Sequence, residues 1–222
     1  MQSQAVIFDV DGVLVDSYQA HMRSWQQMLA EHQIELTEDQ FRTTFGRTSA
    51  DILRELCGNK FTETERLAMD DRKEALYRDL IRAAFPAVDG ARELIDDLTA
   101  AGIALAVGSS GPPENIKLTL DCLGRAEKFS ACITRVDVTW GKPNPQVFQL
   151  AGDRLGLPPA RCCVVEDAPA GVEAANRAGM ASIGLTGTVT PGELAHADLV
   201  VEALGQLSPE VITGLISRKT SC

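Results

Sequence analysis

Short apolar segments alternate with helical segments along this chain, and that alternation limits the fold more than any other feature. The apolar segments are rich in β-branched residues and too short to form free-standing helices. They cover residues 5–10, 103–110, 131–137, 162–167 and 182–187, with a weaker one at 198–204. Strands that are apolar throughout and alternate with helices predict a parallel sheet covered on both faces, which is the Rossmann-like α/β class.

Three of the intervening segments have helical spacing and carry a glycine at or near their end, where helices often terminate. They cover residues 113–124, 144–156 and 170–180. Residues 17–85 break the alternation, because they read as amphipathic helices with threonines at plausible N-caps and contain no strand-like segment. We therefore predict an α/β core domain made of residues 1–16 and 86–222, and a helical domain, residues 17–85, inserted after the first strand.

The charge balance limits the kinds of partner. The chain has 222 residues, of which 21 are basic and 31 acidic, so its formal net charge is −10. This argues against nucleic acid or an anionic membrane surface as partner, although a metal ion or a few amides could still hold a small anionic substrate. No apolar segment approaches the roughly 20 residues of a membrane helix, and no secretory signal is visible. We expect a cytoplasmic monomer that acts on a small molecule.

Carboxylates follow the first and the fourth predicted strands. Asp9 and Asp11 end the first one, and Glu166 and Asp167 end the fourth. Ligands of open α/β sheets bind beyond the carboxyl ends of the strands, so these side chains are expected to converge. Two carboxylates in different environments can divide the work of a nucleophile and a general acid/base. Adjacent acidic residues supply the hard oxygen ligands that Mg²⁺ prefers.

Two further segments at predicted strand ends are suited to a phosphate group. The turn Ser109-Ser110-Gly111 offers hydroxyls and backbone amides, and Lys142 stands just before a helix that begins with proline. Each feature alone has an ordinary explanation, such as a solvated turn, a surface charge or a helix cap. Their common position beyond the strand ends, in this order, indicates a Mg²⁺-assisted site for phosphoryl transfer.

The segments DVDGVLVDS, VGSS, GKPNPQVF and VVEDAPAGVEAANRAGM resemble the four signature motifs of the haloacid dehalogenase (HAD) superfamily, in the same order. The resemblance spans essentially the whole chain, and the helical insert resembles the small helical cap of that superfamily. It implies that Asp9 is the nucleophile that becomes an aspartyl phosphate. It also implies that Asp11 protonates the leaving oxygen and then activates the incoming one. Because Asp11 is present, the chain differs from the dehalogenases after which the superfamily is named.

The resemblance implies roles for the remaining motif residues as well. Ser109 corresponds to the phosphate-binding hydroxyl, with Ser110 and Gly111 beside it in the turn. Lys142 corresponds to the lysine that balances the charge of the phosphoenzyme.

The implied cofactor is Mg²⁺. The implied metal-binding residues are Asp9, Asp11 through its main-chain carbonyl, Asp167 and its acidic neighbour Glu166. The Glu-Asp pair, in place of Gly-Asp, resembles the subgroup that contains β-phosphoglucomutase and sugar-phosphate phosphatases.

Substrate choice is expected to depend on the helical domain. His21, Trp25 and Lys73 resemble cap residues of β-phosphoglucomutase, which implies that His21 and Lys73 bind substrate. A packed histidine and an ordinary solvated lysine are the alternatives. The arginine of the mutases that binds a second phosphate aligns with Ser49, and Arg47, two residues earlier, is the nearest candidate for binding such a phosphate here.

With no clear second-phosphate clamp, we expect a Mg²⁺-dependent phosphatase of small phosphorylated metabolites such as sugar phosphates, acting through an aspartyl phosphate. A phosphohexomutase is the first alternative. A catalytically inactive ligand-binding protein with the same fold is the more remote one.

Overall fold

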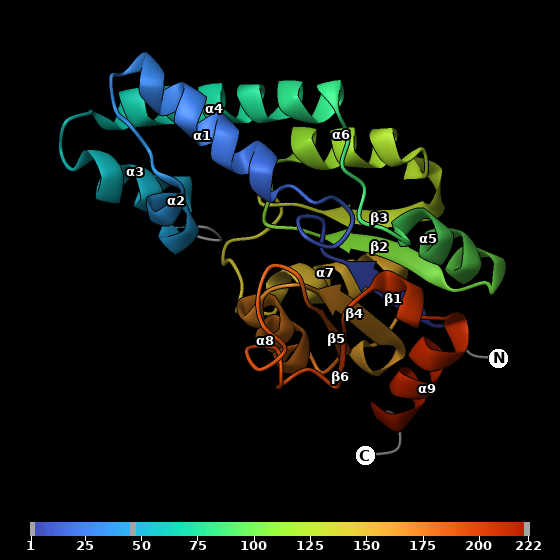
Figure 1. The fold of residues 1–222 in the computed structure, drawn as a ribbon. Helices are drawn as coiled ribbons and strands as arrows, with labels where there is room; N and C mark the ends of the chain where they lie inside the picture. The colour runs from blue at the N-terminus through green and yellow to red at the C-terminus, as the bar shows by residue number, and fades with distance from the viewer. Residues whose placement is uncertain (1–2, 45–47, 220–222) are drawn as a thin grey trace. The chain divides into compact units, whose positions relative to one another are not determined.

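The computed structural model describes residues 3–44 and 48–219. The chain divides into two compact units. One comprises Met1–Asp16 and Pro86–Cys222, and the other comprises Ser17–Phe85. We call them the α/β unit and the helical unit (Figure 1).

The α/β unit is built on one sheet whose strands all run parallel in the order β3-β2-β1-β4-β5-β6. Within the described residues, the strands are β1 (Ala5–Phe8), β2 (Ala104–Gly108), β3 (Phe129–Ile133), β4 (Cys162–Glu166), β5 (Ala181–Leu185) and β6 (Leu199–Val201). Strands β1, β4 and β5 are buried along their whole length, as expected for strands covered on both faces. The predicted α/β fold class is confirmed.

Helices cover both faces of this sheet. The helices of the α/β unit are α5 (Ala91–Ala100), α6 (Pro113–Leu123), α7 (Gln146–Leu155), α8 (Pro169–Arg177) and α9 (Pro209–Lys219), with short 3₁₀ turns at Ala126–Lys128, Pro159–Arg161 and Leu204–Gln206. Helices α7 and α8 share a core cluster with alternate residues of the central strands, while α5 and α9 pack on the sheet separately from that cluster (Figure 1). The predicted glycine caps are confirmed at Gly124 and Gly156, which end α6 and α7 in the left-handed conformation.

The strand order places the first strand at the centre of the sheet. From β1 the chain builds outward through β2 and β3, and then returns to place β4 on the other side of β1. At such a switch point the loops beyond the carboxyl ends diverge and leave a crevice for ligands. The loops that follow β1 and β4 are therefore the expected place for a site.

The third strand differs from its sequence-based boundaries, 131–137. It begins earlier, at Phe129, and ends at Ile133. The Asp137 carboxylate accepts hydrogen bonds from the backbone N–H and the hydroxyl of Thr134, at 2.9 Å each, and this turn ends the strand. A side chain that binds the backbone in this way competes with continued strand pairing.

The helical unit contains α1 (Tyr18–Glu31), α2 (Glu38–Thr44), α3 (Ser49–Cys57) and α4 (Glu63–Ala83). The predicted threonine caps are confirmed for α3 and α4. Thr48 accepts a hydrogen bond from the Asp51 N–H, and Thr62 forms a reciprocal capping box with Glu65. Among the described residues, no helix is both long and apolar enough to cross a membrane.

Candidate active site

Asp9 lies immediately beyond the central strand. Its backbone N–H donates to the Val165 carbonyl on β4 at 3.0 Å, which extends the β1–β4 pairing by one residue. The Asp9 side chain is buried at the switch point of the sheet, where β1 has a neighbouring strand on each side. The pKa of Asp9 is raised to about 7, chiefly because burial disfavours its charged form, and the nearby Lys142 opposes this shift.

Lys142 lies between two carboxylates, that of Asp9 just beyond β1 and that of Glu166 at the end of β4. Its ammonium lies 2.5 Å from Asp9 Oδ1 and 2.7 Å from Glu166 Oε1, and it stands 4.8 Å from the centre of the Phe148 ring. Asp9 and Glu166 act together to raise the pKa of Lys142 above its ordinary value, although burial alone would lower it. Lys142 is therefore a fixed positive charge within the site, held against two carboxylates.

Glu166 is held by hydrogen bonds at both carboxylate oxygens. While Oε1 accepts from Lys142, Oε2 accepts from the backbone N–H groups of Asp167 at 2.7 Å and Ala168 at 2.9 Å. Gly171, in the first turn of α8, makes room for this arrangement, because a Cβ there would lie 1.7 Å from Glu166 Oε1. Glu166 thus anchors Lys142 and at the same time holds the backbone that leads into α8.

Asp167 lies beside the loop that follows Asp9. A Cβ on Gly12 would lie 1.9 Å from Asp167 Oδ2, and Gly12 has φ +75°, so both space and backbone conformation require glycine there. The Thr188 hydroxyl donates a hydrogen bond to the same oxygen from the loop that follows β5. Burial and the neighbouring Glu166 and Asp9 raise the pKa of Asp167.

These carboxylates fit a divalent cation. Oxygens of Asp9, Glu166 and Asp167 all lie within 4.8 Å of one another, and all three residues are buried. Three buried carboxylates face one ammonium, and repulsion among them adds to the effect of burial, which is the main reason that the pKa values of Asp9 and Asp167 are raised. A small cation that prefers oxygen ligands, such as Mg²⁺, suits this set of donors.

The predicted phosphate-binding turn lies beyond β2, next to β1. Ser109 is buried, and its Oγ accepts a hydrogen bond from the Gly111 N–H at 3.0 Å, while Ser110 is exposed. Asp11 lies near the same turn, since a Cβ on Gly111 would be 3.8 Å from Asp11 Oδ2. All of the core residues predicted from the sequence therefore lie beyond neighbouring strands β2, β1 and β4, at the carboxyl edge of the sheet.

The predicted substrate-binding residues of the helical unit also lie together. The Lys73 ammonium on α4 lies 2.9 Å from His21 Nδ1 on α1, and the His21 ring stacks on Tyr77 with ring centres 4.2 Å apart. Lys73 is buried, so the alternative of a solvated surface lysine is wrong. Arg47 lies outside the described residues, and Ser49 is the first residue of α3.

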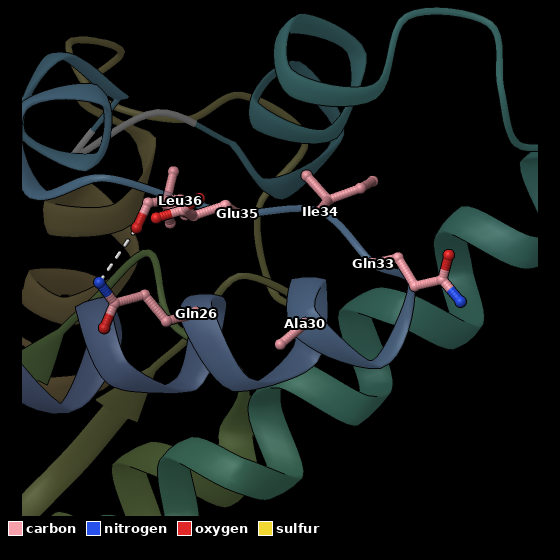
Figure 2. A pocket seen from close by; sticks show the side chains of 6 residues that line it. All are labelled: Gln26, Ala30, Gln33, Ile34, Glu35 and Leu36. Atoms are coloured by element: carbon pink, nitrogen blue, oxygen red, sulfur yellow. Dashed lines mark hydrogen bonds between the residues drawn. The ribbon is translucent and has the colours of Figure 1, made fainter.

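A separate hollow in the helical unit involves none of the predicted residues. It lies where the chain leaves α1 and turns toward α2 (Figure 2). The Gln26 amide crosses part of it and donates to the Leu36 carbonyl at 3.1 Å. The residues that line it are Gln26, Ala30, Gln33, Ile34, Glu35 and Leu36.

Sequence reasoning missed three residues that shape these sites. Thr188 follows a predicted strand, and this position beyond a strand end could have indicated a site residue, but the segment contains no carboxylate or lysine that would have drawn attention to it. Gly171 is an ordinary helix residue in the sequence, and its need for a missing Cβ appears only beside Glu166. Glu74, which is buried and ion-paired to Lys73 at 2.9 Å, reads in the sequence as one more helix surface charge.

Comparisons with known proteins agree with the geometry. A family model described as haloacid dehalogenase-like hydrolase matches residues 4–179. Validoxylamine A 7'-phosphate phosphatase of Streptomyces hygroscopicus subsp. limoneus is 32% identical over 208 residues, covering 92% of this chain and 95% of that protein. Beta-phosphoglucomutase of Bacillus subtilis is 30% identical over 216 residues, covering 94% and 93%.

A solved structure agrees over the full length. The crystal structure of a beta-phosphoglucomutase from Clostridium difficile has a TM-score of 0.87 and 26% sequence identity, and each chain is covered completely. A phosphatase and mutases therefore both resemble this chain at similar levels of identity.

Proposed function

Since this chain belongs to the haloacid dehalogenase-like hydrolase family, we propose that it is a Mg²⁺-dependent phosphatase of small phosphorylated metabolites, with sugar phosphates as the substrate class. The observation that carries the proposal is the contact of Lys142 with both Asp9 and Glu166, with Asp167 alongside. A buried nucleophilic carboxylate beside a fixed ammonium and further cation ligands is suited to attack on an anionic phosphoryl group. Similarity to a named phosphatase supports the same reaction class.

The proposed reaction has two displacements. Asp9 attacks phosphorus, and the bond from phosphorus to the leaving oxygen breaks while Asp11 donates a proton to that oxygen. Water then attacks the aspartyl phosphate, and Asp11 takes up the proton that the water loses. Inorganic phosphate leaves, and the Asp9 carboxylate is regenerated.

The surrounding residues hold the phosphoryl group in place. Lys142 offsets the negative charge that accumulates as Asp9 attacks, and Glu166 keeps Lys142 in position. Ser109 and the amides of the turn through Gly111 bind phosphate oxygens in this proposal.

Asp9, Asp167 and the main-chain carbonyl of Asp11 would hold Mg²⁺, which supplies further positive charge next to the transferring group. Both oxygens of Glu166 already accept hydrogen bonds, so we assign Glu166 a supporting role beside the metal.

A phosphate-release assay tests this proposal. The purified protein would be given hexose 1- and 6-phosphates, a hexitol phosphate and acetyl phosphate, each with Mg²⁺ or with EDTA. We expect phosphate release that depends on Mg²⁺ and differs among the esters. If no ester releases phosphate under any of these conditions, the proposed activity is wrong, and an inactive binding protein becomes the better hypothesis.

A phosphohexomutase is the second candidate, because the chain is similar to named beta-phosphoglucomutases in sequence and structure. The same reactions would be analysed for isomers of β-glucose 1-phosphate with catalytic hexose bisphosphate present. Isomer formation well above phosphate release would favour the mutase. In that case Arg47→Ala should lower isomer formation at least about 30-fold, the scale of a lost charge-assisted contact, and in the phosphatase it should leave acetyl phosphate hydrolysis unchanged.

A further inference from the structure

The helical unit contains a buried chain of polar side chains that runs between two helices. Glu74 Oε1 and His21 Nδ1 each lie 2.9 Å from the Lys73 ammonium. Lys73 and Glu74 are only 3% and 6% exposed. Neighbouring residues on a helix do not usually face each other, so this ion pair on α4 is an unusual arrangement.

Stability alone gives a weak reason for this ion pair. Burying two charges costs several kcal/mol of desolvation, about as much as their attraction returns, and apolar residues of similar size often serve stability equally well. The ammonium is also surrounded by aromatic rings, 5.7 Å from the centre of Trp25 and 5.5 Å from the centre of Tyr77. Cation–π interactions with these two rings stabilise the buried Lys73 ammonium, so a carboxylate partner is not needed for that purpose.

The contact with Lys73 determines where the proton of His21 lies. An ammonium group has three donors and no acceptor, so the nitrogen that contacts it must accept. Nδ1 of His21 is therefore the acceptor, and the neutral ring carries its proton on Nε2. Through its bond to Glu74, Lys73 is held in the orientation that enforces this tautomer.

Glu74 has a second effect, on charge. The carboxylate brings one negative charge to within hydrogen-bonding distance of Lys73 in the cluster formed by His21, Lys73 and Glu74. A Lys73 without this partner would attract an additional anionic group on a substrate, such as a second phosphate. With Glu74 present, a neutral hydroxyl is the better partner for the cluster.

We propose that Glu74 is a positioning residue that fixes Lys73 on His21 Nδ1 and makes the enzyme prefer monophosphates, whose remainder is a neutral polyol, over bisphosphates. This inference rests on the proposed function and on the expectation from the sequence that His21 and Lys73 bind substrate. It assigns the choice between monophosphate and bisphosphate to a residue that does not itself need to touch substrate.

The first experiment measures the tautomer of His21 and needs no activity. The chain has three histidines, so ¹⁵N signals of the rings can be assigned with single histidine variants. At neutral pH we expect His21 to be neutral, with Nε2 protonated, and the glutamine variant E74Q to shift these signals. An Nδ1-protonated ring or an imidazolium in the wild type would overturn the proposed orientation.

The second experiment measures specificity. KM and kcat would be determined for glucose 6-phosphate and glucose 1,6-bisphosphate in the wild type, in E74Q and in the control D79N. Asp79 lies on the same helix with its side chain 70% exposed, so D79N removes one negative charge without touching the cluster. We expect E74Q to raise the ratio of kcat/KM for bisphosphate over monophosphate at least about fivefold, mainly through KM, and D79N to leave it within about twofold.

The outcomes separate this inference from the proposed function. Equal changes for both substrates in E74Q, or the same change in D79N, would overturn the specificity role of Glu74. A wild type that hydrolyses no phosphate ester would overturn the proposed function, while the ¹⁵N measurement would still test the tautomer. Should E74Q fail to fold, E74D keeps the carboxylate and should retain the wild-type ratio, and an altered ratio in it would contradict the charge argument.

Discussion

The Lys142 ammonium lies 2.5 Å from Asp9 Oδ1, although 133 positions separate the two residues in the chain. The contact forms because β1 and β4 are neighbours in the sheet and the loop before α7 brings Lys142 to their carboxyl ends. Glu166, on β4, takes the other side of the ammonium at 2.7 Å. A lysine fixed in this way can balance negative charge on Asp9 without rearranging during a reaction.

The first prediction concerns the nucleophile. Asp9→Asn should lower kcat at least about 1000-fold, because an amide oxygen is a poor nucleophile. The side chain is nearly isosteric, so the fold should survive, and circular dichroism would verify this. Steady-state phosphate release is the measurement. A variant that keeps more than about one hundredth of wild-type turnover would rule out the covalent role of Asp9.

A second prediction separates the two acidic residues beyond β4. Asp167→Ala should weaken Mg²⁺ binding more than Glu166→Gln, because both Glu166 oxygens are already engaged by Lys142 and by backbone N–H groups. Glu166→Gln should instead lower kcat, because a neutral amide holds the Lys142 ammonium less strongly than the carboxylate does. Calorimetric titration with Mg²⁺ and the Mg²⁺ dependence of activity would be compared. An Asp167→Ala variant with an unchanged Mg²⁺ requirement would exclude Asp167 as a ligand.

The third prediction concerns Thr188, whose hydroxyl donates to Asp167 Oδ2. Thr188→Val keeps the shape of the side chain and removes the donor. We expect about tenfold or greater weakening of Mg²⁺ binding, because residues that orient metal ligands typically have effects of that size. Calorimetry measures this without turnover. Thr188→Ser should retain most of the affinity, and a loss of affinity equal to that of Thr188→Val would argue against a role for the hydroxyl.

The strand-end residues could be predicted from the sequence because their positions depend on local patterns. An apolar run that stops at Asp9, or at Glu166, fixes where a parallel strand ends, and all such ends share one edge of the sheet. The end of β3 was less predictable, since the bonds from Thr134 to Asp137 stop the strand inside an apolar run. Helix caps such as Thr62 were predictable because capping involves residues only a few positions apart.

Contacts between residues far apart in the chain could not be predicted from the sequence in this way. Thr188 and Asp167 meet because two loops converge, and no spacing rule links a threonine to a carboxylate 21 positions away. Glu74 looked like a solvated charge, because charged residues surround it in the sequence and hide which side of α4 packs against α1. The resemblance to the β-phosphoglucomutase cap therefore predicted a role for Lys73 but did not indicate its partner, Glu74.

The fourth prediction tests the close approach of α8 to Glu166. Gly171→Ala would place a Cβ 1.7 Å from Glu166 Oε1, so the carboxylate must move away from Lys142. We expect a loss of roughly 1–3 kcal/mol in stability, as for other overpacked buried sites, and a lower kcat. Gly214→Ala in α9 is the matched control, because nothing lies within 4 Å of a Cβ there. Thermal unfolding should show Gly214→Ala as stable as the wild type or more so. Equal stability of the two variants would contradict the steric argument.

The fifth prediction concerns pH in the absence of metal. Burial raises the pKa of Asp9 to about 7 from an ordinary value of 3.8. Between these two values the folded protein holds a proton that the unfolded chain has lost, so folding stability falls as pH rises. The EDTA-treated protein should therefore show a decreasing Tm from pH 5 to pH 8. Asp9→Asn cannot ionise, so its Tm should decrease less over the same range.

Mg²⁺ should reverse this trend, because a cation that binds the ionised carboxylates stabilises the folded state more strongly as protons leave. The increase in Tm on adding Mg²⁺ should thus be larger at pH 8 than at pH 5 in the wild type, and small at both values in Asp167→Ala. Asp167, whose pKa is also raised by burial, contributes in the same direction and leaves part of the pH dependence in Asp9→Asn. A Tm difference between wild type and Asp9→Asn that stays constant from pH 5 to pH 8 without metal would show that Asp9 is ionised throughout, and that Lys142 outweighs its burial.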